Sequence, residues 1–357
     1  MNSLSNAASK ENDDALTECV KPKVKVDRLP SPSDIKTQLL ARPDLLRQVK
    51  QHQQEINNIV SGVDSRMIVV AGPCSIHDMA SAIDYGRRFK RLSEEVSDKL
   101  CLVMRCYFEK PRTTVGWKGL LHDPVLDGSD DMDKGIRLSR TLLLELSGMG
   151  LPLATEALSP LAVSYFDDLI SWVAIGARTT ESQPHREMAS GLSAAVGFKN
   201  ASDGSFTTAT HSIKSAAHPH SFIGVSEQGD IGVVRTEGNP NGHIVLRGGN
   251  GQPNFDALNV ARCQHALRDS GLNPRIMVDC SHENSGKDHL KQPEVLKGIA
   301  EQVCAGNNSI MGVMLESHLN EGRQNITSDM EYGVSVTDSC MSWEQTERSI
   351  KELFSAI

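Results

Sequence analysis

Short apolar runs alternate with amphipathic stretches from about residue 67 to the end of the chain. The runs are too short for buried helices and rich in β-branched residues, whereas the stretches between them have helical spacing. The predicted strands are Met67–Ala71, Cys101–Phe108, Pro152–Glu156, Trp172–Ala177, Val196–Lys199, His243–Arg247, Arg275–Asp279 and Ile310–Glu316. Because parallel strands need helical crossovers, eight strands that are each followed by a helix predict a (β/α)8 TIM barrel of class α/β. An open doubly wound sheet is the competing fold.

Several helices and one hairpin can be placed from local signals. Helices are predicted at Ile136–Leu146 and Phe255–Ser270, and the last helix begins with Ser342 and Gln345 as a capping-box pair. One stretch interrupts the alternation, because two β-like runs flank a turn at residues 227–230. This pattern predicts an inserted β-hairpin at about 221–236, between strands five and six.

Residues 1–66 differ from the barrel sequence that follows them. Val24–Val26 predicts a short strand, and a helical stretch runs from Gln48 to Val60. A segment without a core of its own must pack on the main body or on another subunit. We therefore expect residues 1–66 to be an N-terminal extension for assembly or regulation, and residues 67–357 to be the catalytic barrel.

Composition excludes several classes of protein. The chain has 357 residues, a formal charge of -8, 39% hydrophobic and 23% charged residues, and no apolar run long enough to cross a bilayer. The negative charge argues against a nucleic-acid partner. Eight cysteines without a CxxC pair favour a reducing, cytoplasmic location over a disulfide framework.

Cations follow the predicted strands, and in a barrel the chemistry lies at the carboxyl ends of the strands. Five of them should face one opening: Arg105, Lys110, Arg178, Lys199 and Arg247. Like charges that converge should repel one another unless anions neutralise them. The pattern predicts a substrate with phosphate and carboxylate groups. For the cations between residues 102 and 119 alone, a solvated basic loop is the alternative.

A second set of strand-end residues suggests a metal site. Cys74, His282 and Glu316 follow strands one, seven and eight, which become neighbours when a barrel closes, and Asp338 lies in the loop before the last helix. A thiolate, an imidazole and two carboxylates would suit Mn, Fe, Co or Zn better than Mg or Ca. Taken singly, each residue also fits an ordinary structural role.

The same residues lie in motifs that resemble those of a known family. The motifs are GPCSIHD (72–78), RCYFEKPRTTVGWKG (105–119), AIGARTTESQ (174–183), VGFKN (196–200), HIVLRGG (243–249), DCSHENS (279–285), GVMLESHL (312–319) and SVTDSC (335–340). Together they resemble class I 3-deoxy-D-arabino-heptulosonate 7-phosphate (DAHP) synthase. The resemblance implies a (β/α)8 barrel that condenses phosphoenolpyruvate with erythrose 4-phosphate, the first step of the shikimate pathway.

The resemblance also implies roles for individual positions. It implies that Cys74, His282, Glu316 and Asp338 ligate one divalent metal ion. The residues implied for phosphoenolpyruvate are Arg178, Lys199, the backbone N–H of Ala177 and nearby Glu156 for its phosphate, with Arg105, Lys110 and Arg247 for its carboxylate. The residues implied for erythrose 4-phosphate are Lys110, Pro111, Arg112 and Thr113. Lys110, Cys74 and His282 are the implied catalytic residues.

Regulation by an aromatic amino acid is a further implication of the resemblance. The matching positions are Pro160, Leu192, Ser193, Phe222 and Gly224. Gly224 stands where phenylalanine-sensitive relatives tend to have Ser, which favours tyrosine as the effector; the alternative is a glycine that lets a strand bend. The family also implies a homodimer or homotetramer.

Two rival functions and one redox property complete the expectations. The nearest rival is 3-deoxy-D-manno-octulosonate 8-phosphate synthase, which has a KANR-type loop where this chain has Lys110–Thr113. The other rival is a non-catalytic metabolite sensor, which need not keep the metal ligands or Lys110. Because Cys340 lies two residues from Asp338, we expect oxidation in the absence of metal to link Cys74 with Cys340.

Overall fold

A computed structural model describes residues 24–112 and 114–357 of the chain. The chain divides into two units after residue 30, and the described residues of the first are 24–30. In the first unit, the described residues 24–30 form no strand, so the strand predicted at Val24–Val26 is wrong. Both valines are exposed, and a strand without a partner cannot satisfy its backbone hydrogen bonds. Thr113 lies outside the described residues.

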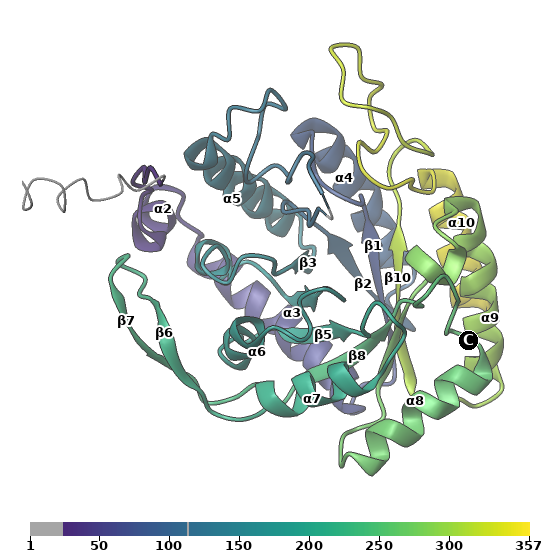
Figure 1. The fold of residues 1–357 in the computed structure, drawn as a ribbon. Coiled ribbons are helices and arrows are strands. Elements are labelled where there is room, and N and C mark those ends of the chain that lie inside the picture. The colour runs from purple at the N-terminus through teal and green to yellow at the C-terminus, as the bar shows by residue number, and fades with distance from the viewer. Residues whose placement is uncertain (1–23, 113) are drawn as a thin grey trace, which may run out of the picture. The chain divides into compact units, whose positions relative to one another are not determined.

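The second unit is a closed barrel of eight parallel strands (Figure 1). The strands are β1 (Met67–Gly72), β2 (Leu100–Arg105), β3 (Leu153–Glu156), β4 (Trp172–Ile175), β5 (Ala195–Lys199), β8 (Gly242–Leu246), β9 (Ile276–Asp279) and β10 (Ile310–Glu316). The barrel closes where β1 pairs with β10, with Gly72 opposite Glu316. The predicted (β/α)8 barrel is confirmed.

Helices surround the strands. They are α4 (Met79–Glu95), α5 (Met132–Gly148), α6 (Gln183–Ser190), α7 (Thr207–Ala216), α8 (Ala257–Asp269), α9 (Gln292–Cys304) and α10 (Trp343–Ala356), with short 3-10 helices η1 (Val163–Tyr165), η2 (His282–Ser285) and η3 (His289–Lys291). The predicted capping box opens α10, because Ser342 and Gln345 each accept a backbone N–H of the other. Between β3 and β4 the crossover contains η1 in place of the expected α-helix.

In the described residues before the barrel there are two helices, α2 (Pro32–Gln38) and α3 (Pro43–Ser61). Ile56, Ile59 and Val60 of α3 share one buried cluster with interior side chains such as Trp172. Trp172 begins β4, so α3 closes the amino end of the barrel. The carboxyl ends of the strands are thereby left as the accessible opening.

The predicted hairpin is also present, as β6 (Ser221–Val225) paired antiparallel with β7 (Ile231–Arg235). The large side chains on its two faces differ in exposure, as expected for a hairpin with one covered face. Ile223, Ile231 and Val233 are exposed on one face, whereas Phe222 and Val234 are half-buried on the other.

Candidate active site

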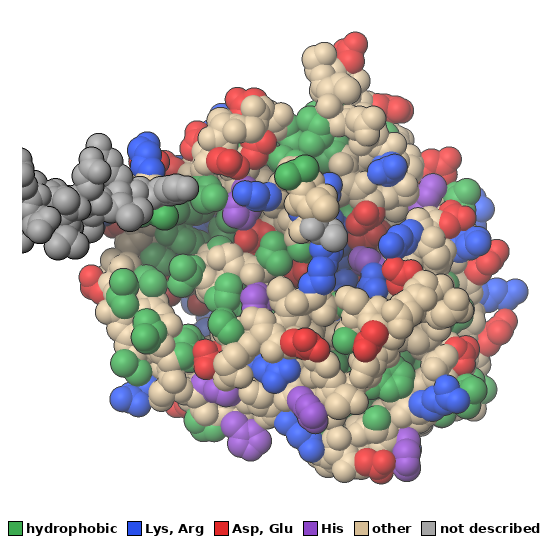
Figure 2. All heavy atoms as spheres, in the orientation of Figure 1, with side chains coloured by type: hydrophobic (Ala, Val, Ile, Leu, Met, Phe, Trp, Pro, Cys, Tyr) green, Lys and Arg blue, Asp and Glu red, His purple; other side chains and the backbone are tan. Residues whose placement is uncertain are grey.

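Most of the residues predicted at the strand ends line one cavity of about 590 Å³, whereas Cys74 is fully buried and is not among its lining residues. Its charged lining comprises Arg105, Lys110, Arg112, Glu156, Arg178, Lys199, Arg247, His282, Lys287, Glu316, Arg323 and Asp338. Pro111 and Ala177 also line it. Figure 2 shows Lys and Arg side chains gathered in a hollow near the middle of the drawn face, with acidic side chains among them. We call this space the mouth cavity.

Carboxylates of the chain itself accompany several of the cations. Arg105 Nη2 donates to Glu316 Oε1 at 2.9 Å, and both side chains are 1% exposed. Lys199 Nζ lies 3.1 Å from Asp279 Oδ2, and Arg247 Nη2 lies 3.8 Å from Glu283 Oε1. The expectation that only bound anions offset the converging cations was therefore incomplete.

Three of the four predicted metal ligands come together. One ligand atom each from Cys74, Glu316 and Asp338 lies within 4.8 Å of the others. Lys110 Nζ stands beside two of them, at 2.7 Å from Cys74 Sγ and 3.1 Å from Asp338 Oδ2. A buried cation among a thiol and two carboxylates shows that this cluster accommodates positive charge, so its donor set fits a divalent ion.

The ionisation of the cluster follows from burial and charge. Burial, with the Glu316 charge, raises the pKa of the Cys74 thiol to about 12. The thiol donates to Asp338 Oδ2 at 3.2 Å and accepts from Lys110, as a neutral thiol should. Lys110 beside it holds the pKa of Asp338 below its usual value. Burial opposes the charge of Glu316, but Arg105 and the other nearby cations together outweigh it, and the pKa of Glu316 is lowered. A metal that binds here must release the thiol proton.

The fourth predicted ligand faces a different partner. His282 Nδ1 lies 2.9 Å from Asp279 Oδ2, and neither ring nitrogen joins the cluster of three. The backbone of His282 has φ 54°, in the left-handed region that non-glycine residues rarely adopt. Such strain concentrates at functional sites.

Cys340, the predicted redox partner of Cys74, is fully buried. Its sulfur lies 3.6 Å from the backbone oxygen of Asp338, whose side chain accepts from the Cys74 thiol. Both thiols therefore flank Asp338, and their oxidation stays a prediction.

Comparison with known proteins now decides the family. Residues 46–351 match the model of the DAHP synthetase I family. The chain belongs to this family. It is 54% identical over 309 residues to the Tyr-sensitive phospho-2-dehydro-3-deoxyheptonate aldolase of Escherichia coli K12, covering 86% of each chain. It is 50% identical over 315 residues to the tyrosine-inhibited aldolase of Schizosaccharomyces pombe, covering 87% of this chain and 85% of that one.

A solved structure agrees with the family assignment. The phospho-2-dehydro-3-deoxyheptonate aldolase of Francisella tularensis SCHU S4 superposes with a TM-score of 0.91 at 45% identity. The match covers 93% of this chain and 98% of that one. The DAHP synthetase I fold therefore extends over nearly the whole chain.

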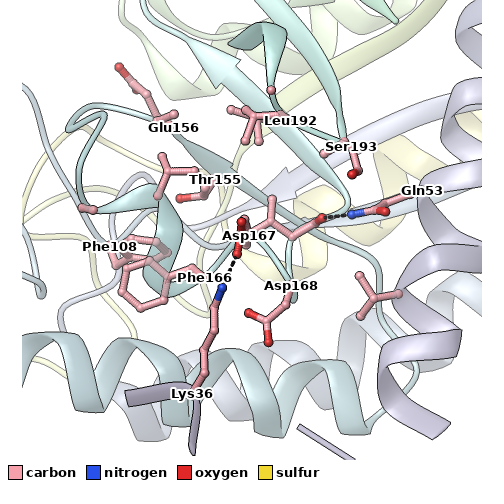
Figure 3. A pocket seen from close by; sticks show the side chains of 18 of the residues that line it. Lys36, Gln53, Phe108, Thr155, Glu156, Phe166, Asp167, Asp168, Leu192 and Ser193 are labelled. Atoms are coloured by element: carbon pink, nitrogen blue, oxygen red, sulfur yellow. Dashed lines mark hydrogen bonds and ion pairs between the residues drawn. The ribbon is translucent and has the colours of Figure 1, made fainter. Parts of the chain in front are cut away.

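A second cavity of about 350 Å³ lies where η1 replaces the expected helix, and we call it the side cavity (Figure 3). Phe108, Phe166 and Leu192 give it apolar walls. It also contains opposite charges, since Lys36 Nζ lies 2.8 Å from Asp167 Oδ1. Apolar walls with both charge signs suit a zwitterion that carries a hydrophobic side chain.

The predicted effector residues divide between the side cavity and the hairpin. Leu192 and Ser193 line the cavity, whereas Pro160, Phe222 and Gly224 are not among the residues that line it. Phe222 and Gly224 lie in β6. A side chain at Gly224 would place its Cβ 2.7 Å from Cγ2 of Val234, so Gly224 packs closely against the facing strand of the hairpin.

One residue and one segment connect the two cavities. Glu156, at the end of β3, lines both of them. Phe108 and Glu109 border the side cavity, and Lys110 and Arg112 border the mouth cavity. The segment at residues 108–112 therefore borders both cavities.

Sequence reasoning gave no role to several residues around the mouth cavity. Ser281 Oγ donates to Glu316 Oε2 at 2.8 Å, and Gln292 Nε2 donates to the Glu316 backbone oxygen at 3.0 Å. Ser281 lies two residues after the end of β9, so its position at a strand end was a signal for a role in the site. Gln292 lies 24 residues from Glu316, and no sequence pattern connects the two. Arg323 lines the cavity from the loop after β10 and likewise carries no periodic signal.

Proposed function

We propose that this chain condenses phosphoenolpyruvate with erythrose 4-phosphate and water to give 3-deoxy-D-arabino-heptulosonate 7-phosphate and phosphate, the first step of the shikimate pathway. The observation that carries the proposal is that strand-end cations line one cavity of a DAHP synthetase I chain, beside a cluster of three metal-ligand candidates of which Glu316 and Asp338 line that cavity. The relatives above are named as aldolases of this type.

The cations of the mouth cavity divide between two substrates. In this proposal Arg178, Lys199 and the Ala177 N–H bind the phosphate of phosphoenolpyruvate near Glu156, and Arg105, Lys110 and Arg247 bind its carboxylate. Pro111, Arg112 and Thr113 hold erythrose 4-phosphate together with Lys110. Guanidinium groups support these roles because they bind phosphate and carboxylate oxygens with paired hydrogen bonds.

Cys74, Glu316 and Asp338, with His282, would hold one divalent ion, of which Mn, Fe, Co and Zn suit the mixed donors. When bound, the ion supplies Lewis acidity toward a carbonyl oxygen. The proximity of the Cys74, Glu316 and Asp338 donors supports this assignment.

Lys110 is the proposed proton donor. The enol carbon of phosphoenolpyruvate attacks the aldehyde carbon, a C–C bond forms, and the aldehyde oxygen takes the electron pair and then a proton from the Lys110 ammonium. Cys74, Asp338 and Glu316 outweigh burial and raise the pKa of Lys110, so this ammonium is present at neutral pH.

Water then adds to the carbon that bears the phosphate ester and gives up one proton, which replaces the proton taken from Lys110. The C–O bond to phosphate breaks, phosphate leaves with that electron pair, and the proton of the new hydroxyl passes to the phosphate as the ketone forms. The surrounding cations stabilise the leaving phosphate and hold both substrates in line.

The experiment is a comparison of two sugars. Consumption of phosphoenolpyruvate is measured with erythrose 4-phosphate and with arabinose 5-phosphate, each with and without Mn²⁺. We expect kcat/KM to favour erythrose 4-phosphate on the order of 100-fold or more, because the loop at residues 110–113 has the family's KPRT sequence. A preference for arabinose 5-phosphate would establish the rival synthase, and folded protein inactive with both sugars would establish the sensor.

We further propose that an aromatic amino acid, tyrosine by preference, inhibits the enzyme from the side cavity and the adjoining hairpin. The apolar walls and the Lys36–Asp167 pair support a zwitterionic effector with a ring. Lys36 Nζ also donates to Glu227 Oε1 at 3.0 Å, so it links α2, the side cavity and the turn of the hairpin.

Assembly and location complete the proposal. We propose a homodimer or homotetramer, supported by the apolar face of the hairpin with Ile223, Ile231 and Val233 exposed. A cytoplasmic location is supported by the need to keep the Cys74 thiol reduced. Among the described residues, no helix combines the length and apolar character needed to cross a membrane.

A further inference from the structure

Asp279 stands between two groups that the proposed chemistry uses. It ends β9 and is 0% exposed. Its Oδ2 lies 2.9 Å from His282 Nδ1 and 3.1 Å from Lys199 Nζ. Its Oδ1 accepts the backbone N–H of Ser281 at 3.1 Å, which fixes the carboxylate.

We propose that Asp279 is a positioning residue that orients His282 for metal binding and balances the charge of Lys199 at the phosphate site. The inference rests on the proposed function, because it assumes that His282 is a ligand and that Lys199 binds phosphate. It adds that substitution of Asp279 must change both metal binding by His282 and phosphate binding by Lys199.

The His282 half of the inference follows from the ring's two nitrogens. A carboxylate beside Nδ1 favours the tautomer that carries its proton there, which leaves the lone pair of Nε2 available for a metal. His282 Nδ1 has no aligned hydrogen bond to any described residue, and the same holds for Asp279 Oδ2. Asp279 Oδ2 lies 2.9 Å from His282 Nδ1 and 3.1 Å from Lys199 Nζ, so one carboxylate oxygen faces both groups.

The local backbone keeps this pair together. Asn284 Nδ2 donates to the backbone oxygen of Asp279 at 2.9 Å, and the backbone N–H of Lys287 donates to the backbone oxygen of His282. With the left-handed φ of 54° at His282, these bonds close the turn that brings the ring back to Asp279.

The Lys199 half is electrostatic. Lys199 Nζ lies 3.1 Å from Asp279 Oδ2, and the two side chains are 5% and 0% exposed, so water screens their opposite charges little. The carboxylate therefore offsets part of the positive charge that Lys199 offers to phosphate. Without it, inorganic phosphate should bind more tightly and leave more slowly.

The inference predicts that one substitution weakens Mn²⁺ binding and strengthens phosphate binding. Loss of structure would weaken both. In Asp279→Asn, the dissociation constant of Mn²⁺, measured by calorimetry on metal-free protein, should rise about 10- to 100-fold. The dissociation constant of inorganic phosphate should fall several-fold in the same protein. Asp123→Asn is the matched control, because Asp123 is a buried carboxylate that accepts the backbone N–H of Gly128 and does not line the mouth cavity.

Either of two results overturns the inference: an Mn²⁺ affinity within about twofold of wild type, or phosphate binding that is unchanged or weaker. Neither result contradicts the proposed function, provided that the wild-type protein binds Mn²⁺ and catalyses the reaction. Wild-type protein that binds no Mn²⁺ refutes the proposed function itself.

A second test uses the wild-type protein, so it does not require that Asp279→Asn folds. Nitrogen-15 NMR of metal-free protein, with the His282 signals assigned by comparison with His282→Gln, reports the tautomer directly. The proton should reside on Nδ1; a proton on Nε2 overturns the inference.

Discussion

Nζ of Lys110 donates a hydrogen bond to Sγ of Cys74 across 2.7 Å, so the proposed proton donor and a proposed metal ligand are in direct contact. Lys110 comes from the loop after β2, and Cys74 from the loop after β1. Their contact places the lysine's positive charge beside the groups that would hold the ion. The two residues are 36 positions apart in the sequence, but the fold brings their side chains into contact.

Replacement of Lys110 by Met should separate these roles. We expect kcat to fall about 10²- to 10⁴-fold, the usual contribution of a general acid, while Mn²⁺ binding persists or tightens because a neighbouring cation is gone. Lys118→Met, in the same loop but exposed, is the control and should keep normal turnover. Normal turnover in Lys110→Met would rule out its role as donor.

Loss of the thiol should abolish metal binding and activity together. Cys74→Ala removes one donor from the cluster of three, and a chelator should reproduce the loss of rate in wild type, reversibly on addition of Mn²⁺. Cys263→Ala is the control, because Cys263 is a buried thiol in α8. Full activity in chelator-treated, metal-free enzyme would contradict the metal assignment.

His243 should make stability fall in acid. Burial lowers its pKa to about 4, with Arg275 adding to the effect, and Trp172 Nε1 donates to the neutral ring at 3.1 Å. Because an unfolded histidine takes up a proton near pH 6.5 and this one does not, the free energy of unfolding should decrease from about pH 6.5 down to pH 4. The decrease should reach about 3 kcal/mol.

Denaturant titrations of wild type and His243→Gln between pH 4 and 7 measure this effect. Glutamine still accepts from Trp172 but does not titrate, so the variant should lose most of the histidine's share of the pH dependence. Parallel curves for the two proteins would show that His243 contributes nothing.

The hairpin glycines offer a paired test of effector choice. Gly224→Ser must displace Val234, whereas Gly232, its partner across the hairpin, has open space for a side chain. We expect Gly224→Ser to weaken inhibition by tyrosine relative to phenylalanine about tenfold, because displaced packing costs roughly 1–3 kcal/mol. Gly232→Ser should leave the ratio of the two inhibition constants unchanged. An unchanged ratio in Gly224→Ser would refute the role of this position.

Local signals predicted those parts of the fold that local interactions determine. The capping box of Ser342, the hairpin and the eight strands each rest on neighbours in sequence, and all are present. Strand β2 ends at Arg105 instead of Phe108, because the chain there leaves the ladder while its side chains stay buried. Periodicity measures burial and cannot separate a buried strand from a buried loop.

Site residues that lie in sequence motifs could be predicted, whereas those that depend on tertiary contacts could not. Arg105 and Lys199 were placed by the rule that chemistry lies at strand ends, and both line the mouth cavity. Nothing in the spacing indicated that Asp279 would lie beside both Lys199 and His282. That arrangement depends on the pairing of β8 with both β5 and β9 and on an unusual φ at His282.

The most direct test is a stoichiometry measured on wild-type protein with phosphoenolpyruvate, erythrose 4-phosphate and Mn²⁺. We predict one phosphate released for each phosphoenolpyruvate consumed, with both stopping when the sugar is omitted or the metal is chelated, and resuming when it is restored. Phosphoenolpyruvate consumed without the sugar, or folded and metal-loaded protein that consumes none, would contradict the account.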